Sequence, residues 1–149
     1  MWFNESPDNR ILSWRAWRDK LEEKSLDEVA EIVAADWAKV PTVTHYLAPD
    51  QILDWPNPWQ LITDNLYCDL SITLGMYYSL ALLEHPTMTD LKLQVYKTCD
   101  GWLNLSLMNQ GKYVLNYNHG KVVNRSQLNI SQENLRFEYL NIDLCSKFK

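Results

Sequence analysis

The spacing of the hydrophobic residues changes once along this chain, at Pro86, and this change constrains the fold more than any other feature. Before Pro86, apolar residues recur every three to four positions, which is typical of helices with one buried face. After Pro86, apolar and polar residues alternate, which is typical of strands with one buried face. Helices followed by antiparallel strands define an α+β fold, with the helices covering one face of the sheet.

The first two helices are predicted from their apolar stripes and from the residues at their ends. Between Pro7 and Ser25 one face carries the apolar residues Ile11, Trp14, Trp17 and Leu21. A second helix begins after Ser25, which forms a capping-box pattern with Glu28. We expect this helix to end before Pro41, because the residue that precedes a proline avoids helical geometry.

Two more helices are predicted before the strands begin. Residues 41–57 have no clear period and contain several prolines, so they read as a loop. Asn57 can cap a short helix that has Pro58 at its first position. The longest helical pattern runs over 66–84, with Asp64 or Asn65 as its cap. We expect this to be the central helix of the fold.

The strand-rich part, residues 90–141, shows four or five alternating runs. Three of them are joined by turns and are predicted to pair antiparallel; their apolar positions are Leu91, Leu93, Val95; Leu103, Leu105, Leu107; and Tyr113, Leu115. Shorter runs follow at 122–123 and 135–139. No repeat or linker divides the chain, so we predict one domain over 1–149, with a helical part at 8–85.

Charge and composition exclude several classes of protein. The net charge is −5 and no run of Lys or Arg exceeds a pair, so we expect no nucleic-acid partner. The longest apolar stretch is too short and interrupted to span a membrane. Three cysteines without paired spacing argue against disulfides and metal sites, and we expect no cofactor. The N-terminus lacks a signal-peptide pattern, so we expect a cytoplasmic protein.

Aromatic residues are unusually frequent, with seven Trp and eight Tyr. Large aromatic side chains fill protein cores, and Trp and Tyr also anchor protein interfaces. We interpret most of them as core residues and the remainder as candidates for contacts with other proteins.

Cys68 is the residue whose context most suggests catalysis. If the central helix begins at Leu66, the thiol lies in the first turn, where the helix dipole lowers a thiol pKa and favours the thiolate. The alternative is a structural role, because cysteine is often buried as a small apolar residue. We favour the structural role on these grounds alone.

The order of motifs around Cys68 resembles a known enzyme superfamily. A Trp-Pro-Asn-Pro-Trp segment and short helix at 55–62 precede Asn-Leu-Tyr-Cys-Asp at 65–69, then a long helix and a Gly-Lys-Tyr-Val-Leu-Asn hairpin at 111–116. This order is similar to the transglutaminase-like and papain-like cysteine peptidases. In small bacterial members a Gly-Asp-Cys-x-Asp motif holds the nucleophile, and a His and an Asp follow on successive strands.

The resemblance implies a catalytic set that this sequence completes only in part. Cys68 matches the nucleophile, and Asn116 stands at the position of the acid that orients the histidine. The histidine should fall within 101–104, where there is none. A cysteine nucleophile needs a nearby base and a group that orients the base. Among the histidines elsewhere in the chain, His119 is the best substitute base.

We therefore predict a non-catalytic interaction or structural subunit on a degenerate transglutaminase-like scaffold, with other protein subunits as its partners. The segment Trp55–Trp59 also resembles small structural proteins of tailed bacteriophages, which implies a virion component of the neck, tail or baseplate. The alternative is a cysteine hydrolase or amidase with Cys68 as nucleophile, His119 or His85 as base and Asn116 as orienting residue. The first hypothesis predicts that no imidazole nitrogen lies within hydrogen-bond range of the Cys68 sulfur.

Overall fold

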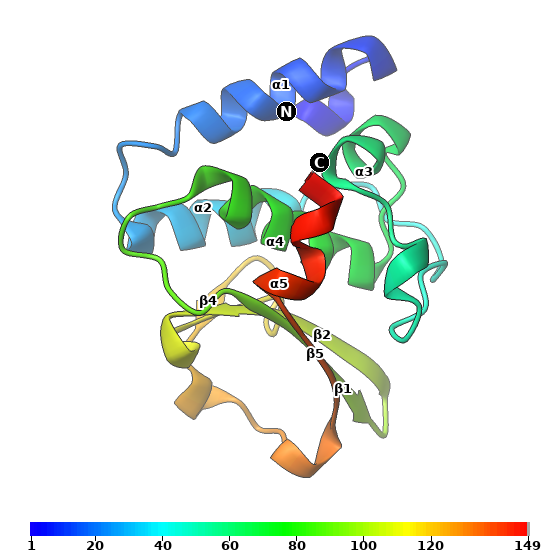
Figure 1. Cartoon of the computed structure of the whole chain (residues 1–149), viewed down its shortest axis with the longest axis vertical. Coiled ribbons are helices and arrows are strands. Elements are labelled where there is room, and N and C mark those ends of the chain that lie inside the picture. The colour runs from blue at the N-terminus through cyan, green and yellow to red at the C-terminus, as the bar shows by residue number, and fades with distance from the viewer. Residues whose placement is uncertain (149) are drawn as a thin grey trace.

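A layer of helices lies on one face of a five-stranded antiparallel sheet in the computed structural model, which describes residues 1–148 (Figure 1). The helices come first in the chain and the strands second, as the change of hydrophobic period predicts. After the last strand, α5 (Asn141–Leu144) and η6 (Cys145–Phe148) return to the helical layer, where Phe148 packs against Tyr78 with ring centroids 5.7 Å apart. The α+β fold class is confirmed.

The first two α-helices follow the predicted boundaries closely. A 3-10 turn, η1 (Trp2–Asn4), precedes α1 (Pro7–Asp19), and α2 (Leu26–Trp37) ends before Pro41. Ser25 caps α2, since its hydroxyl accepts the Glu28 backbone N–H at 3.2 Å. The Glu28 carboxylate accepts from the Ser25 hydroxyl at 3.1 Å, so the predicted capping box is only half formed.

The predicted third helix, α3 (Pro58–Asp64), is present with its full capping box. The Gln60 backbone N–H donates to Asn57 Oδ1 at 2.8 Å, and the Asn57 backbone N–H donates to Gln60 Oε1 at 3.0 Å. Both partners lie within one turn, which explains why the sequence alone predicts this helix start. The preceding loop contains a single 3-10 turn, η2 (Ile52–Asp54).

The central helix, α4 (Asp69–Leu83), begins later than the predicted Leu66. Asn65 adopts a left-handed conformation (φ 55°) that closes α3, so neither Asn65 nor Asp64 caps the central helix. Tyr67 is extended, and its carbonyl accepts the Val43 N–H at 2.8 Å. This contact with the 41–57 loop takes the residues before Cys68 out of the helix. Cys68 is therefore the N-cap and does not lie in the first turn.

Every residue from Leu70 to Leu80 is buried, because α4 lies between the other helices and the sheet. At Gly75 the helix approaches the Trp37 ring so closely that a Cβ atom would overlap it. Trp37 Nε1 and Trp14 Nε1 donate to the Ser79 hydroxyl at 3.0 and 3.3 Å, which ties α1 and α2 to α4. Within residues 1–148, no helix combines the length and apolar character that a membrane crossing needs.

The sheet has the strand order β4-β3-β2-β1-β5, and all neighbours are antiparallel. This is the larger of the two predicted strand numbers. The strands are β1 (Lys92–Thr98), β2 (Gly101–Met108), β3 (Tyr113–Leu115), β4 (Val122–Val123) and β5 (Leu135–Leu140). The 3-10 turn η3 (Asn109–Gly111) joins β2 to β3.

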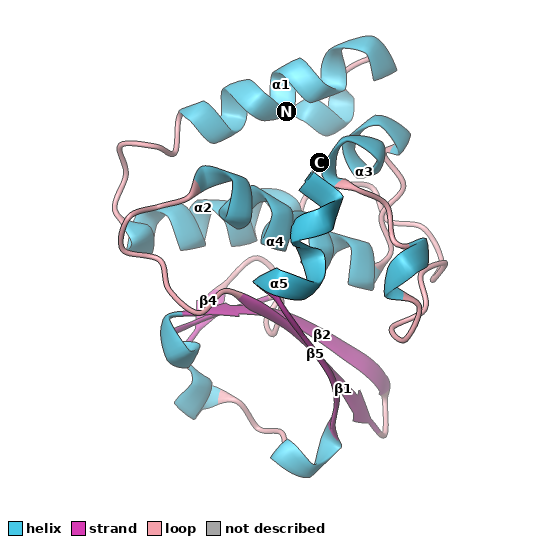
Figure 2. Ribbon diagram, viewed as in Figure 1, coloured by secondary structure: helices cyan, strands magenta, loops and turns pink. Residues whose placement is uncertain are grey.

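The second face of the sheet is also covered. The segment between β4 and β5, with η4 (Arg125–Gln127) and η5 (Gln132–Asn134), crosses the face opposite the helices (Figure 2). A smaller apolar core lies beneath it, made of Tyr96, Leu105, Leu107, Val114 and Val123. From Asn104 to Met108 the side chains of β2 are therefore buried on both faces, whereas the alternation of the sequence predicted one buried face.

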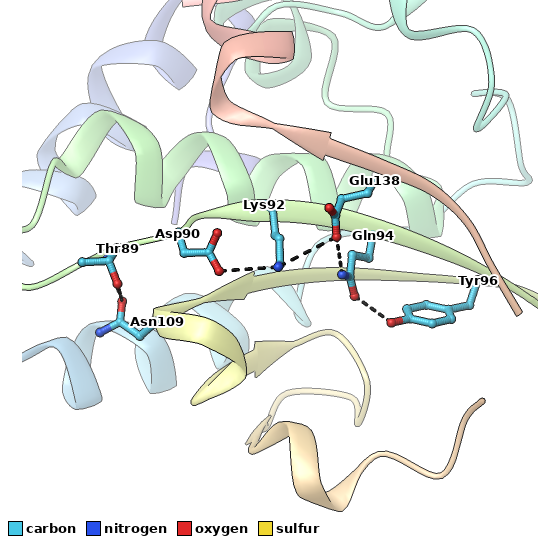
Figure 3. Close-up of polar contacts among 7 residues, drawn as sticks. All are labelled: Thr89, Asp90, Lys92, Gln94, Tyr96, Asn109 and Glu138. Carbon is cyan, nitrogen blue, oxygen red and sulfur yellow. Dashed lines mark hydrogen bonds and ion pairs between the residues drawn. The ribbon is translucent and has the colours of Figure 1, made fainter. Parts of the chain in front are cut away.

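A chain of polar contacts on this second face connects β1 to the edge strand β5 (Figure 3). Buried Gln94 donates to Glu138 Oε2 at 2.6 Å and accepts from the Tyr96 hydroxyl at 2.7 Å. Lys92 Nζ lies 3.4 Å from Asp90 and 3.8 Å from Glu138. Because buried polar groups need partners, these contacts help to hold β5 in register.

Candidate site at the N-terminus of the central helix

Cys68 lies at the N-cap of α4 with its side chain 2% exposed. The Ser71 hydroxyl accepts the Cys68 backbone N–H at 2.7 Å and donates to the Cys68 carbonyl at 2.9 Å. These contacts hold the backbone of Cys68 at the start of the helix. The thiol is thus close to the unpaired N–H groups of the first turn, where negative charge is favoured.

Two opposing effects act on the pKa of the Cys68 thiol. Burial raises it, while the N–H groups of Tyr46, Ser71 and Leu47 and the Ser71 hydroxyl lower it, and together these donors hold the pKa below its ordinary value of 9.0. Tyr46 and Leu47 belong to the 41–57 loop, so two of these N–H donors come from tertiary packing. The lowered pKa raises the fraction of thiolate at a given pH, and the thiolate is the reactive form of cysteine.

Asn104 is the residue of the 101–104 segment whose side chain reaches the helix N-terminus. It lies on β2 opposite Val95, on the face that α4 covers, and is 3% exposed. Its Nδ2 donates to Asp69 Oδ2 at 2.8 Å, and its backbone carbonyl accepts from the Thr73 hydroxyl at 2.9 Å. Asn104 Oδ1 has no hydrogen-bond partner within the described residues. The resemblance places the expected histidine within 101–104, but it does not single out Asn104.

Asn116 follows β3 and meets the same cluster from the neighbouring strand. Its left-handed backbone (φ 73°) turns the side chain toward α4, where Nδ2 lies 3.2 Å from Asp69 Oδ1 and 2.7 Å from Thr73 Oγ1. The same nitrogen donates to the Asn104 carbonyl at 3.1 Å. The structure therefore places two amides around the Asp69 carboxylate, directly after Cys68 in the chain.

The contacts of Asp69 and Thr73 have no distinctive signal in the sequence. A carboxylate in a first helical turn is common, because it complements the helix dipole, so Asp69 carried no distinctive signal. Thr73 looked like an interruption of an apolar run. Both roles depend on β2 and β3 lying against α4, which is a long-range arrangement.

The histidines do not take part in this cluster. His85 Nε2 lies 2.9 Å from the Lys24 carbonyl, and His85 Nδ1 accepts the Thr87 N–H. His119 is exposed in the turn between β3 and β4, and His45 is exposed in the 41–57 loop. Among residues 1–148, no hydrogen bond joins an imidazole to the Cys68 sulfur. The part of the chain described also holds no group of three or more His, Cys, Asp or Glu suited to a metal ion.

The side chains of this cluster are amides and one carboxylate. Transfer of an acyl group to a thiol and onward to water needs a group that accepts and returns a proton near neutral pH. Amide side chains such as Asn104 and Asn116 do neither. The Asp69 carboxylate accepts hydrogen bonds from both amides, so the cluster joins the N-terminus of α4 to β2 and to the residue after β3.

Comparison with solved structures finds the same fold in LapG of Legionella pneumophila. Calcium-bound LapG matches 97% of this chain and 91% of its own, with a TM-score of 0.70 and 13% identity. A second LapG structure and an EGTA-treated one each match 89% of this chain, with a TM-score of 0.66 and 16% identity, and 78% and 77% of their own chains.

LapG is a transglutaminase-like cysteine protease, so this likeness supports the predicted transglutaminase-like fold. At such low identity the likeness extends to the fold alone, and it gives no support to the predicted link with bacteriophages. No family model matches the sequence, and no curated protein matches it either.

Proposed function

We propose that this chain is a non-catalytic transglutaminase-like domain that binds other proteins as a subunit of a larger assembly. One observation carries the proposal: Asn104 stands on β2, facing the N-terminus of α4, where the resemblance expects a histidine. Its Nδ2 donates to Asp69 Oδ2 at 2.8 Å. An amide in this place removes the general base that the enzymatic mechanism requires.

The position of Asn116 does not by itself separate the two candidates. Asn116 stands where the resemblance expects the acid that orients the histidine, and its Nδ2 lies within hydrogen-bond distance of Asp69, Thr73 and the Asn104 carbonyl. An asparagine can orient a catalytic imidazole through its carbonyl oxygen, as in papain-like proteases. The proposal therefore rests on Asn104 and not on Asn116.

Three apolar side chains are strongly exposed, on three separate elements: Leu53 is 92% exposed, Ile142 79% and Leu12 65%. Apolar side chains exposed singly are common on monomeric proteins, so these three do not define an interface. The role in a phage neck, tail or baseplate rests on the resemblance of 55–59 alone. Trp55 itself is buried and donates to the Ala48 carbonyl at 2.9 Å, so it belongs to the core.

The second candidate is a cysteine hydrolase or amidase that uses Cys68. The lowered pKa of the thiol favours it, because a thiolate is the attacking form. It would need a base other than Asn104, and His119 is the predicted one. The two candidates differ in one measurable property, which is repeated turnover at Cys68.

A turnover assay tests the proposal. In a Cys99→Ser/Cys145→Ser background, p-nitrophenyl acetate reports acylation of Cys68, and mass spectrometry follows the acyl-enzyme. We expect at most one slow acylation per chain and no sustained hydrolysis above that of Cys68→Ala. Sustained hydrolysis that Cys68→Ala abolishes, and that His119→Ala also reduces, would establish the enzyme instead.

A further inference from the structure

A groove of about 600 Å³ separates the 41–57 loop from the end of α3, on the outer side of the loop segment that contacts Cys68. Its floor is made of the buried side chains Leu47, Trp55 and Leu61. Its rim carries the apolar side chains Leu53, Leu66 and Tyr46, which are 92%, 50% and 45% exposed. The groove therefore offers apolar surface both inside and around its mouth.

Two exposed carboxylates, Asp54 and Asp64, also line this groove, and none of the lysines and arginines among residues 1–148 lines it. Among residues 1–148, neither carboxylate has an ion-pair partner within 4.0 Å. Lys147 Nζ donates to the Trp55 carbonyl at 2.9 Å. Burial lowers the pKa of Lys147, and the negative charge of Asp54 opposes this lowering. A concave apolar wall with two carboxylates concentrates negative potential.

The walls of the groove are held in place by hydrogen bonds across them. The Tyr46 hydroxyl donates to the Leu66 carbonyl at 2.7 Å, and Trp55 Nε1 donates to the Ala48 carbonyl at 2.9 Å. A pocket held open by such contacts needs little reorganisation to receive a ligand. Cys68 does not line it, so the groove is a surface separate from the thiol.

We propose that this groove binds an extended segment of a partner protein that carries a Lys or Arg between apolar residues. The apolar floor and rim match the flanking side chains, and Asp54 and Asp64 match the cation. This inference rests on the proposed function and names the chemistry of its partner. An acidic or a fully polar segment would meet repulsion or leave the apolar floor wet.

Two short synthetic peptides test the proposal: acetylated and amidated Ala-Leu-Lys-Leu-Ala, and the same peptide with Glu in place of Lys. The indole N–H signal of Trp55 in nitrogen-15 NMR spectra reports on the floor of the groove, and that of Trp14 serves as an internal control. We expect the Lys peptide to shift the Trp55 signal and to bind about tenfold more tightly than the Glu peptide.

Charge variants sharpen the test. Asp54→Asn with Asp64→Asn should weaken binding of the Lys peptide by about tenfold. Glu22→Gln with Glu23→Gln changes the net charge equally, in the turn between α1 and α2, and should leave binding unchanged. Leu53→Ser should also weaken binding and, being exposed, should not unfold the protein. Equal binding of the two peptides, or no loss in the Asp54/Asp64 variant, would overturn the proposal.

The outcomes separate this inference from the proposed function. If the Lys peptide binds at Trp55 and is cleaved in a Cys68-dependent way, the groove assignment stands and the non-catalytic role is wrong. If no peptide shifts the Trp55 signal and no turnover occurs, the groove assignment is wrong and the non-catalytic role stands.

Discussion

Asn104 on β2 donates to the Asp69 carboxylate at 2.8 Å, and this contact joins the sheet to the first residue of the central helix. The other oxygen of Asp69 accepts from Asn116 at 3.2 Å. One carboxylate therefore connects two strands to the helix N-terminus, beside the thiol of Cys68. These two amide–carboxylate contacts hold the start of α4 against β2 and against the residue that follows β3.

This relationship predicts a measurable coupling. Asp69→Ala leaves the buried Asn104 amide without its acceptor, so we expect a loss of about 2 kcal/mol in the free energy of unfolding. Asn104→Ala should cost less once Asp69 is absent, with a coupling energy of about 1 kcal/mol in a double-mutant cycle by urea unfolding. Asp8→Ala, in the first turn of α1, is the control and should cost well under 1 kcal/mol. Strict additivity would contradict the coupling.

Gly75→Ala should destabilise the protein, although helix propensity alone predicts a gain of about 1 kcal/mol. The new Cβ would overlap the ring of Trp37, which is fully buried. We expect a loss of about 3 kcal/mol or more, measured by urea unfolding. In a Trp37→Leu background the same change should cost much less, because the clash is gone. A stabilised Gly75→Ala variant would show that α2 and α4 do not approach as described.

The lowered pKa of the Cys68 thiol predicts a pH dependence of stability. The folded state releases this proton at lower pH than the unfolded state, so the thiolate stabilises the fold above the ordinary thiol pKa of 9.0, and this gain is lost as pH falls through the folded pKa. In a Cys99→Ser/Cys145→Ser background, the stability advantage over Cys68→Ala should grow between pH about 7 and about 10. A shrinking advantage would mean that burial outweighs the N–H donors.

Buried tyrosines predict the opposite trend at higher pH. Burial raises the pKa of Tyr67 to about 12, although the Trp2 indole lowers it in part. Burial raises the pKa of Tyr77 and Tyr78 further. Above pH 10.0, the ordinary phenol value, the unfolded chain loses these protons first. Each such tyrosine then removes about 1.4 kcal/mol of stability per pH unit until its folded pKa is reached.

Tyr78→Phe tests this alkaline trend. The variant should lose about 1 kcal/mol at neutral pH, because the Tyr78 hydroxyl donates to the Pro56 carbonyl at 2.6 Å. Its stability should then fall less steeply than that of the wild type in urea unfolding above pH 10.0. An unchanged slope would show that Tyr78 ionises at its ordinary pH in the folded protein.

Local patterns in the sequence determined the secondary structure and the fold class. The Asn57–Gln60 capping box, the apolar stripe of α2 and the alternation in 91–115 depend on groups within a few residues of one another. Such interactions act in the same way wherever the segment lies. The ends of α2 and the start of α3, a sheet of four or five strands and the helix-then-strand order follow from them.

Contacts between distant segments decided where α4 begins, what covers the second face of the sheet and which residues meet at the candidate site. The bond between Val43 and the Tyr67 carbonyl moves the start of α4 to Asp69, and the 117–134 segment buries the second face of β2. The meeting of Asn104 and Asn116 at Asp69 requires β2 and β3 to pair and to lie against α4. Periodicity reports which face of an element is apolar, but only tertiary packing decides what that face meets, because the partner lies far away in the sequence.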